Sequence, residues 1–243
     1  LVSSEEGPQQ GDPLGPLIFS LTVNPILTSL ESDITMGYLD DFTICGEIDI
    51  VAKDIERVDR LAGSMGLTLN ISKCEVITAD SPETLPDIFQ DFLFLRPEQA
   101  SLLGAPILPG PAMDILLNKR CVDLQRAIDR FSLISAHDAL LILKNALGSS
   151  KMLYMLRASP CSYHPALTRF DDLLRTALAR ISNACLSDLN WIQASLPVKD
   201  GGLGIRSVAL LAPSAFMASA AATLSLQSQI IPTDCILVDR LGD

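Results

Sequence analysis

Apolar residues near the start of the chain recur at helical spacing, directly after Asp12-Pro13. Aspartate is a favourable N-cap and proline suits the first helical position, so the pattern predicts a helix that begins there. Pro25 is expected to kink or end this helix, with the apolar face continuing to about residue 31. The apolar positions of its first turns are Leu14, Leu17, Ile18 and Leu21.

The next segments alternate between strand and helix patterns. Residues 34–45 hold two β-type runs on either side of Asp40-Asp41, which predicts a hairpin. Residues 49–65 return to helical spacing, and Gly66 fits a left-handed stop after them. Two further strands are expected at 67–70 and 74–77.

A proline- and aspartate-rich stretch, residues 80–111, is the expected domain boundary, with one short strand at 101–105. After residue 111 the pattern is wholly helical, and helices are expected near 112–134, 137–147, 165–186 and 207–229. These patterns predict an α+β domain over 1–111, with a small antiparallel sheet, and an all-helical region over 112–243.

Residues 207–233 contain no charged side chain, which raises the question of a membrane span. Proline, serine, threonine and glutamine interrupt the run, and its alanines are only mildly hydrophobic. We therefore expect a buried alanine-rich helix and no membrane partner.

Composition narrows the class of protein. Of 243 residues, 48% are hydrophobic and 19% charged, which excludes wholesale disorder. The six cysteines form no C-x-x-C pair, so we expect free thiols in an intracellular, reducing compartment and no disulfide partner. Whether that compartment is cytoplasm or nucleus stays open. The first residues show no signal-peptide pattern and no initial methionine, so we expect a piece of something longer or an incomplete gene product.

Charge is unevenly distributed along the chain. Residues 1–111 hold 18 acidic and 5 basic side chains, whereas residues 112–243 hold 11 acidic and 13 basic ones. A nucleic-acid partner needs a local cationic surface rather than a cationic average. The second half therefore keeps such a partner possible despite the net charge of −11.

The adjacent carboxylates of Asp40 and Asp41 are the strongest chemical candidates. Two carboxylates held about 4 Å apart repel each other by about 1 kcal/mol in water and more inside a protein. A divalent cation removes this repulsion, and Mg²⁺ prefers carboxylate and phosphate oxygens. A solvated Asp-Asp turn without a metal is the alternative for the pair taken alone.

Four segments in order resemble the motifs of reverse transcriptases, closest to those of non-LTR retrotransposons. Residues 7–19 (GPQQGDPLGPLIF) resemble motif B, and Tyr38-Leu39-Asp40-Asp41 resembles the Y-x-D-D of motif C. Residues 66–74 (GLTLNISKC) resemble motif D, and residues 102–107 (LLGAPI) resemble the motif E strand. The resemblance implies a partial polymerase palm over 1–111, followed by a helical thumb and connector over 112–243.

The resemblance also implies roles for individual residues. Asp40 and Asp41 would hold two catalytic magnesium ions, and Lys73 would neutralise or protonate the leaving pyrophosphate. Gln10 and Gly11 would line the template and the incoming nucleotide, and Tyr38 would lie beside the primer end. The partners implied are an RNA template, a DNA primer and a deoxynucleoside triphosphate. An ordinary loop residue remains the alternative for Gln10, and an exposed turn lysine for Lys73.

One departure from the family pattern concerns the metal site. The family's palm has a third aspartate on a strand upstream of motif B, and this sequence has no counterpart before Asp12. The two-ion site is therefore expected to be incomplete and the chain by itself to be inactive. The alternatives are a decayed or repurposed remnant that binds RNA or protein and, as a weaker match, an RNA-dependent RNA polymerase.

Several other features have weaker functional interpretations. The basic residues of 112–243 could lie on helix faces that contact phosphates, although ordinary solvated faces are equally consistent. Asp171-Asp172 is expected at the surface, the two histidines are expected to be structural, and Gly201–Gly204 is expected to be a plain turn. The basic residues in question are Lys119, Arg120, Arg126, Arg130, Arg169, Arg175 and Arg180.

Overall fold

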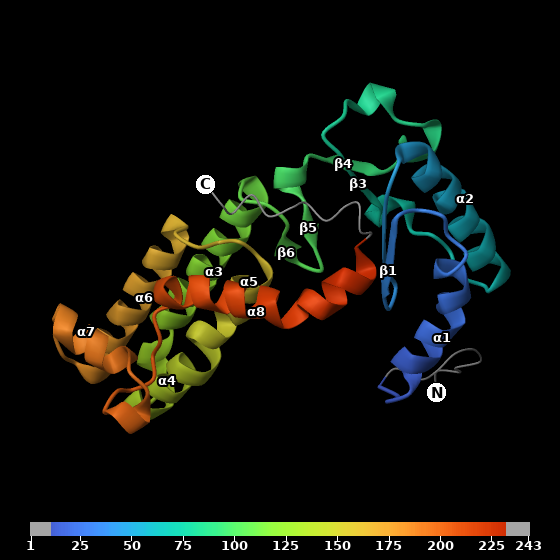
Figure 1. The fold of residues 1–243 in the computed structure, drawn as a ribbon. Helices are drawn as coiled ribbons and strands as arrows, with labels where there is room; N and C mark the ends of the chain where they lie inside the picture. The colour runs from blue at the N-terminus through green and yellow to red at the C-terminus, as the bar shows by residue number, and fades with distance from the viewer. Residues whose placement is uncertain (1–10, 232–243) are drawn as a thin grey trace. The chain divides into compact units, whose positions relative to one another are not determined.

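The computed structural model describes residues 11–231, which form two compact units (Figure 1). Unit 1 comprises Leu1–Phe94 together with Ser225–Asp243, and unit 2 comprises Leu95–Leu224. The division falls between residues 94 and 95, inside the stretch 80–111 where the sequence indicated a boundary. The β5–β6 hairpin belongs to unit 2 because the Tyr154 and Ser159 hydroxyls donate hydrogen bonds to Leu103 O and Pro106 O.

In unit 1, a hairpin lies between two helices along the chain. Helix α1 (Gly15–Leu27) leads into the antiparallel strands β1 (Ile34–Tyr38) and β2 (Asp41–Cys45), and helix α2 (Ile48–Ser64) follows. The predicted hairpin and second helix are thus confirmed. A small core of Ile26, Val58 and Ala62 joins the elements, and partly buried apolar side chains surround it.

The first helix begins later than the sequence indicated. Asp12 does not cap the helix itself, because its Oδ1 accepts a hydrogen bond from Leu14 N–H at 2.9 Å in a preceding turn. The helix starts at Gly15, with Pro16 in its first turn. Pro25 lies inside the helix and does not end it, since α1 continues to Leu27.

Gly66 has a positive φ of 77° directly after α2, as a left-handed helix stop requires. Leu67 N–H returns to Ala62 O at 2.9 Å, which satisfies a terminal carbonyl of the helix. Residues 67–70 form no strand, so that prediction was wrong. The chain there enters a short 3₁₀ helix, Ile71–Lys73, before β3 (Glu75–Ile77).

The strands of residues 11–231 form three separate two-stranded sheets and not one small sheet. The first contains β1 and β2, and the second pairs β3 with β4 (Leu93–Leu95). The third pairs β5 (Ser101–Leu102) with β6 (Ala105–Pro106), so the strand expected at 101–105 is a short hairpin. Its turn residues, Leu103 and Gly104, both have positive φ.

Unit 2 is helical beyond the β5–β6 hairpin, as expected. The helices are α3 (Pro111–Asp129), α4 (Ala136–Ile142), α5 (Ser149–Ala158), α6 (Pro165–Ser182), α7 (Asp188–Ser195) and α8 (Val208–Ile230). A π-helical turn, Leu143–Leu147, follows α4. The sequence analysis missed α5 and α7, although Ser187 and Asn190 form a capping box at the start of α7.

The core of unit 2 lies between α3, α5 and α6. Aliphatic and sulfur-containing side chains dominate it, as the low aromatic content predicts. Its most buried members include Leu117, Met152, Leu156, Phe170 and Leu174.

Helix α8 is not the buried helix that the sequence indicated. Only Val208 and Ala212, in its first turns, are buried, whereas Leu210 is 81% and Met217 64% exposed. Further along the helix, Leu224 and Leu226 are also exposed, by 61% and 53%. By length and composition alone, α8 is the one helix among the described residues that could cross a membrane.

Candidate functional site

The hairpin of unit 1 carries Asp40 and Asp41 at its tip. Tyr38 pairs with Asp41, so Leu39 and Asp40 are the two residues of the turn. Both carboxylates and the Tyr38 ring are exposed, the latter by 64%. The hairpin therefore presents two acids and an aromatic ring together at one exposed end.

Leu39 adopts a left-handed backbone conformation in this turn, with φ of 57°. A residue with a Cβ atom in that region carries a cost of about 1–3 kcal/mol. Such strain is typical of sites where the surrounding structure determines the backbone. Here the paired strands on both sides of the turn hold Leu39 in place.

Close packing of α1 on β1 fixes one face of the hairpin. A Cβ atom at Gly37 would lie 2.6 Å from Leu27 Cδ1, so a glycine permits the approach of the helix to the strand. Leu27 ends α1, and Gly37 lies one residue before Tyr38. The helix that begins within the segment resembling motif B therefore contacts the strand that leads into Tyr38–Asp41.

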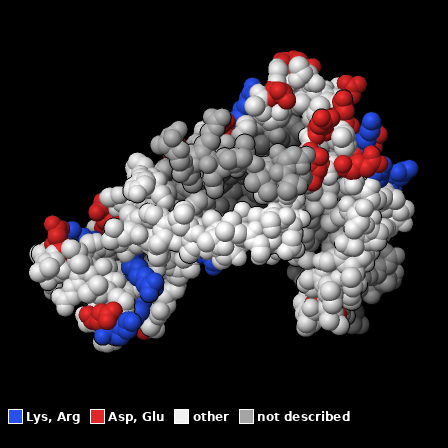
Figure 2. Space-filling model, in the orientation of Figure 1, with Lys and Arg blue, Asp and Glu red and all other residues white. Residues whose placement is uncertain are grey.

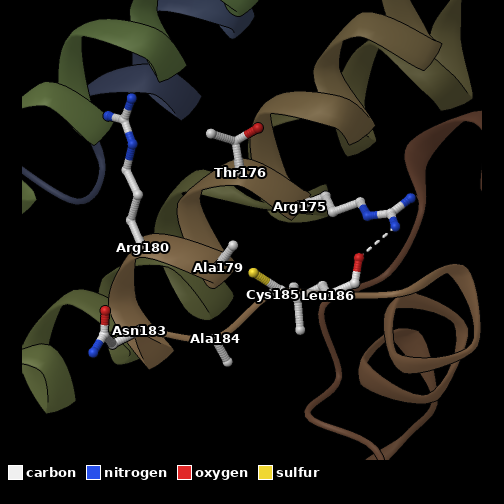
Figure 3. Close-up of a pocket in the computed structure, with 8 residues that line it drawn as sticks. All are labelled: Arg175, Thr176, Ala179, Arg180, Asn183, Ala184, Cys185 and Leu186. Carbon is white, nitrogen blue, oxygen red and sulfur yellow. Dashed lines mark hydrogen bonds between the residues drawn. The ribbon is translucent and has the colours of Figure 1, made fainter.

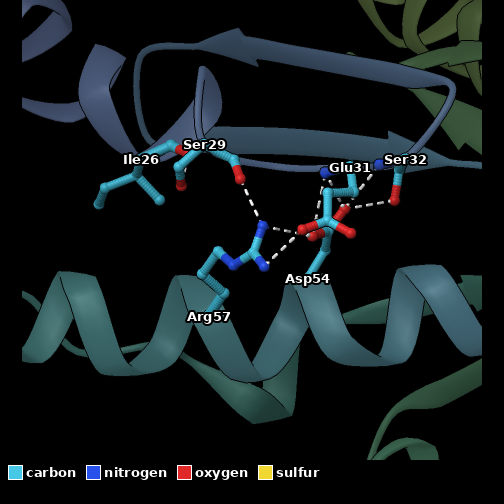
Figure 4. Close-up of polar contacts among 6 residues, drawn as sticks. All are labelled: Ile26, Ser29, Glu31, Ser32, Asp54 and Arg57. Atoms are coloured by element: carbon cyan, nitrogen blue, oxygen red, sulfur yellow. Dashed lines mark hydrogen bonds and ion pairs between the residues drawn. The ribbon is translucent and has the colours of Figure 1, made fainter.

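Asp54 of α2 anchors the segment between α1 and β1 (Figure 4). Its carboxylate is 1% exposed and accepts hydrogen bonds from the backbone N–H groups of Glu31 and Ser32 and from the Ser32 hydroxyl. Arg57, one turn later, pairs with Glu31 at 2.8 Å and donates to Ser29 O. This network fixes the entry into β1.

Two opposing effects act on the pKa of Asp54. Burial raises the pKa, but hydrogen bonds from Ser32 and Glu31 and the charge of Arg57 outweigh it, and the pKa lies below its ordinary value. The sequence analysis missed this residue. The sequence pattern that could have identified Asp54 is its position on the apolar face of the predicted helix, between Val51 and Val58.

The donor set at the hairpin tip is too small for a two-ion magnesium site. Within residues 11–231, no group of three or more histidine, cysteine, aspartate or glutamate side chains is arranged to hold a metal ion. Asp40 and Asp41 supply two carboxylates in solvent, whereas Mg²⁺ needs near-octahedral oxygen coordination. The described residues alone therefore do not fit such a site.

Two further predicted site residues, Lys73 and Gly11, are exposed. Lys73 ends the 3₁₀ helix after residue 70 and forms no ion pair with either aspartate in the described part of the chain. Gly11 has φ of 94° and open space around its Cα, which suits close approach of a ligand. Gln10 lies outside the described residues.

Several of the arginines that were expected to contact phosphates form ion pairs with aspartates. Arg126 pairs with Asp123 at 3.6 Å, and Arg180 with Asp129 at 3.8 Å. Arg175 pairs with Asp188 at 2.7 Å.

Arg175 and Arg180 line an open hollow at the end of α6, together with Thr176, Asn183 and Cys185 (Figure 3). The Arg175 guanidinium also donates to Leu186 O at 2.5 Å and so ties the α6–α7 connection together. The carbonyl end of a helix disfavours anions. The hollow is therefore better explained as a structural joint than as a phosphate site.

The Gly201–Gly204 loop is a structural turn, as expected. The N–H groups of Leu203 and Ile205 donate to Ala194 O, and those of Gly202 and Gly204 donate to Pro197 O and Leu196 O. These donors are occupied by carbonyls around the end of α7. They are therefore not free to cradle a phosphate.

His164 has a structural role at the start of α6. Its Nδ1 accepts a hydrogen bond from Ala166 N–H, and its Nε2 lies 2.9 Å from Asp114 Oδ1. The side chain therefore caps α6 and joins it to α3. His137 is exposed on α4.

Asp171 is buried, contrary to the surface position expected for it. It is 8% exposed and accepts hydrogen bonds from the Ser207 hydroxyl at 2.5 Å and from Val208 and Ala209 N–H. It thus caps α8 from α6, while Asp172 is exposed as predicted. Burial, and secondarily the charge of Asp172, raises the pKa of Asp171 against the effect of these hydrogen bonds.

Comparison with known proteins adds one finding to this geometry. Searches of curated proteins and of solved structures gave no significant match. The family model for reverse transcriptase (RNA-dependent DNA polymerase) matches residues 2–107, a range that contains the hairpin, α1, α2 and all four motifs. This first part of the chain is therefore similar to reverse transcriptases.

Proposed function

We propose that the chain is the C-terminal part of an RNA-directed DNA polymerase of non-LTR retrotransposon type. Residues 1–111 would be a partial palm, and residues 112–243 a thumb and connector. The observation that supports this proposal is the Tyr38–Asp41 hairpin, whose strained two-residue turn exposes Asp40 and Asp41. This hairpin lies within the segment that matches the family. An RNA template, a DNA primer and deoxynucleoside triphosphates are the partners of the parent protein.

The proposed metal site is shared with another segment. Asp40 and Asp41 contribute two ligands, and the remaining carboxylate comes from outside the described residues. Magnesium, when bound, supplies charge stabilisation for phosphoryl transfer. In this proposal the hairpin holds two acids in position, Lys73 offers a cation to the leaving group, Tyr38 flanks the primer, and Gln10 and Gly11 contact template and nucleotide. The chain by itself is inactive.

Primer extension in Mg²⁺ tests this proposal. The chain alone is expected to give no product, whereas the chain joined to a segment with a strand-borne third aspartate is expected to extend the primer. In the joined protein, Asp40→Asn should abolish extension. Asp59→Asn, an exposed acid on α2, should leave it unchanged. Extension that survives Asp40→Asn would remove the catalytic assignment.

A second candidate is a non-catalytic remnant that binds RNA or protein. The lack of a three-carboxylate group among residues 11–231 favours it for the chain as it stands. Binding to a primer–template duplex at increasing salt separates the cases. Log affinity that falls linearly with log salt indicates phosphate contacts, whereas weak binding independent of salt indicates a remnant with no nucleic-acid role.

A further inference from the structure

Helix α8 has two opposite apolar faces, and the core of unit 2 covers one of them. Val208 and Ala212 are buried in that core. Leu210 lies two residues from each of them, about 200° around the helix, and therefore points the other way. Leu210, Met217 and Leu224 follow one another on this second face and are exposed by 81%, 64% and 61%. Packing within unit 2 therefore does not account for these three side chains.

Small residues alternate with the three large ones on the exposed face. With Ser214 and Ala221 between them, the steps along the chain are four, three, four and three residues. This 4–3 spacing places the five side chains in one narrow stripe, about 20 Å long, which is the pattern of a helix that packs along a second helix. Pro213 disturbs the helix on its N-terminal side, so Ser214 to Leu224 form one continuous face. We call these five residues, all exposed and all in unit 2, the α8 seam.

No charged side chain lies on the α8 seam or directly beside it. Residues 207–224 contain none, and Figure 2 shows α8 as an uncharged band on the face that is drawn. In paired helices, charges beside the seam attract a different helix and can repel an identical one. The flanking positions here are apolar, so nothing selects against an identical helix. These positions are Leu211, Pro213, Ala218 and Ala220.

The alternation of large and small residues makes the α8 seam complementary to itself. When two copies run antiparallel about a two-fold axis, Met217 of one copy faces Ala221 of the other, and Leu224 faces Ser214. Every large side chain then fills the space beside a small one. In a parallel pair, large residues would face large ones and small residues small ones, which leaves voids.

We propose that two copies of this chain associate through the α8 seam, with the two helices antiparallel. A seam of five residues buries an area at the low end for specific dimers, below about 1,200 Å² in total, so the dimer should dissociate in the micromolar range. This inference goes beyond the proposed polymerase, because it does not depend on catalysis at Asp40.

A lipid bilayer is the competing occupant, since α8 has the length and composition of a span. The residues after the seam disfavour it. Residues 225–229 are exposed, and four of the five are serine or glutamine, whose polar groups are costly in hydrocarbon. The start of α8 is also fixed to unit 2, because the Asp171 carboxylate accepts hydrogen bonds from Ser207, Val208 and Ala209. A second protein helix therefore fits the seam better than lipid does.

Sedimentation equilibrium of the full chain tests the proposal. Between about 1 and about 200 μM, the parent chain should shift towards twice the monomer mass. A reducing agent keeps the exposed thiols of Cys45 and Cys185 from forming disulfides between copies. Met217→Glu should raise the dissociation constant about a hundredfold, because the two-fold axis places the unfavourable carboxylate in the interface twice. Leu226→Glu is the matched control and should have little effect, since Leu226 is exposed on the same helix but on the other side.

A charge-free pair of variants tests the facing of large and small residues. Ala221→Met alone should weaken the dimer about tenfold, because it places a large side chain opposite Met217 of the second copy. Adding Met217→Ala to Ala221→Met should restore most of the affinity, since each large residue again faces a small one. Trp191 fluorescence, which reports on unit 2, verifies that each variant is folded. Asp40→Asn should associate like the parent chain, so failure of the polymerase proposal would leave this result intact.

A parent chain that stays monomeric at the highest concentration would overturn the proposal. Equal weakening by Met217→Glu and Leu226→Glu would also overturn it, because the contact would then not follow the seam. Flotation of the monomeric chain with phosphatidylcholine vesicles, lost in Met217→Glu, would instead assign the face to lipid.

Discussion

Asp54 and Ser32 are joined twice, because the backbone N–H and the hydroxyl of Ser32 both donate to Asp54 Oδ2, at 2.8 and 2.6 Å. Ser32 lies two residues before β1, and Asp54 lies on the helix that follows β2. This contact closes the segment that contains the hairpin. It links the position of Asp40 and Asp41 to a buried carboxylate that takes no part in any proposed chemistry.

Asp54→Asn should destabilise unit 1 by about 3 kcal/mol, because hydrogen bonds to a charged group are lost and the amide offers hydrogens to donors. Hydrogen exchange of the β1 and β2 amides measures the effect. Asp59→Asn, an exposed acid on the same helix, is the matched control and should change exchange little. Equal protection in the two variants would show that Asp54 does not anchor the hairpin.

The stabilisation by Asp54 should depend on pH. Its folded pKa lies below the unfolded value, so its ionised form contributes stability above the unfolded pKa, and that contribution is lost as pH falls through the folded pKa. The difference in unfolding free energy between the parent chain and Asp54→Asn should therefore shrink on acidification below about pH 4. A difference that stays constant would contradict the lowered pKa.

Asp171 should show the opposite dependence. Its folded pKa lies above the unfolded value because the carboxylate is buried, so its contribution is greatest below the unfolded pKa and is lost as pH rises through the folded pKa. Urea unfolding followed by Trp191 fluorescence should show the parent chain gaining stability relative to Asp171→Asn as pH falls. Asp172→Asn, its exposed neighbour, should not reproduce this trend.

Gly202→Ala should destabilise unit 2 by about 3 kcal/mol, the upper range for an overpacked site. A Cβ atom there would lie 2.1 Å from Leu196 O and 2.6 Å from Gln193 O, and backbone atoms cannot move aside cheaply. Gly201→Ala is the control, since its Cβ meets nothing within 4 Å and only its φ of 81° opposes the change. In thermal unfolding, Gly202→Ala should have a clearly lower Tm than Gly201→Ala. A higher Tm for Gly202→Ala would be inconsistent with this packing.

Local sequence determined the elements in which neighbouring residues decide the structure. Apolar periodicity located α2, α3, α6 and α8, and the β-type runs around Asp40-Asp41 located the hairpin of the candidate site. Gly66 marked the end of α2 because only the local backbone conformation matters there. The motif residues from Gly7 to Ile107 likewise indicated the family that the comparison matched over residues 2–107.

Tertiary structure alone decided the contacts between distant residues. Asp54 and Asp171 are buried because partners 22 and 36 residues away in the chain, Ser32 and Ser207, bring donors to them. Burial of α8 was wrongly expected, because composition shows that a helix is apolar but not which neighbours cover it.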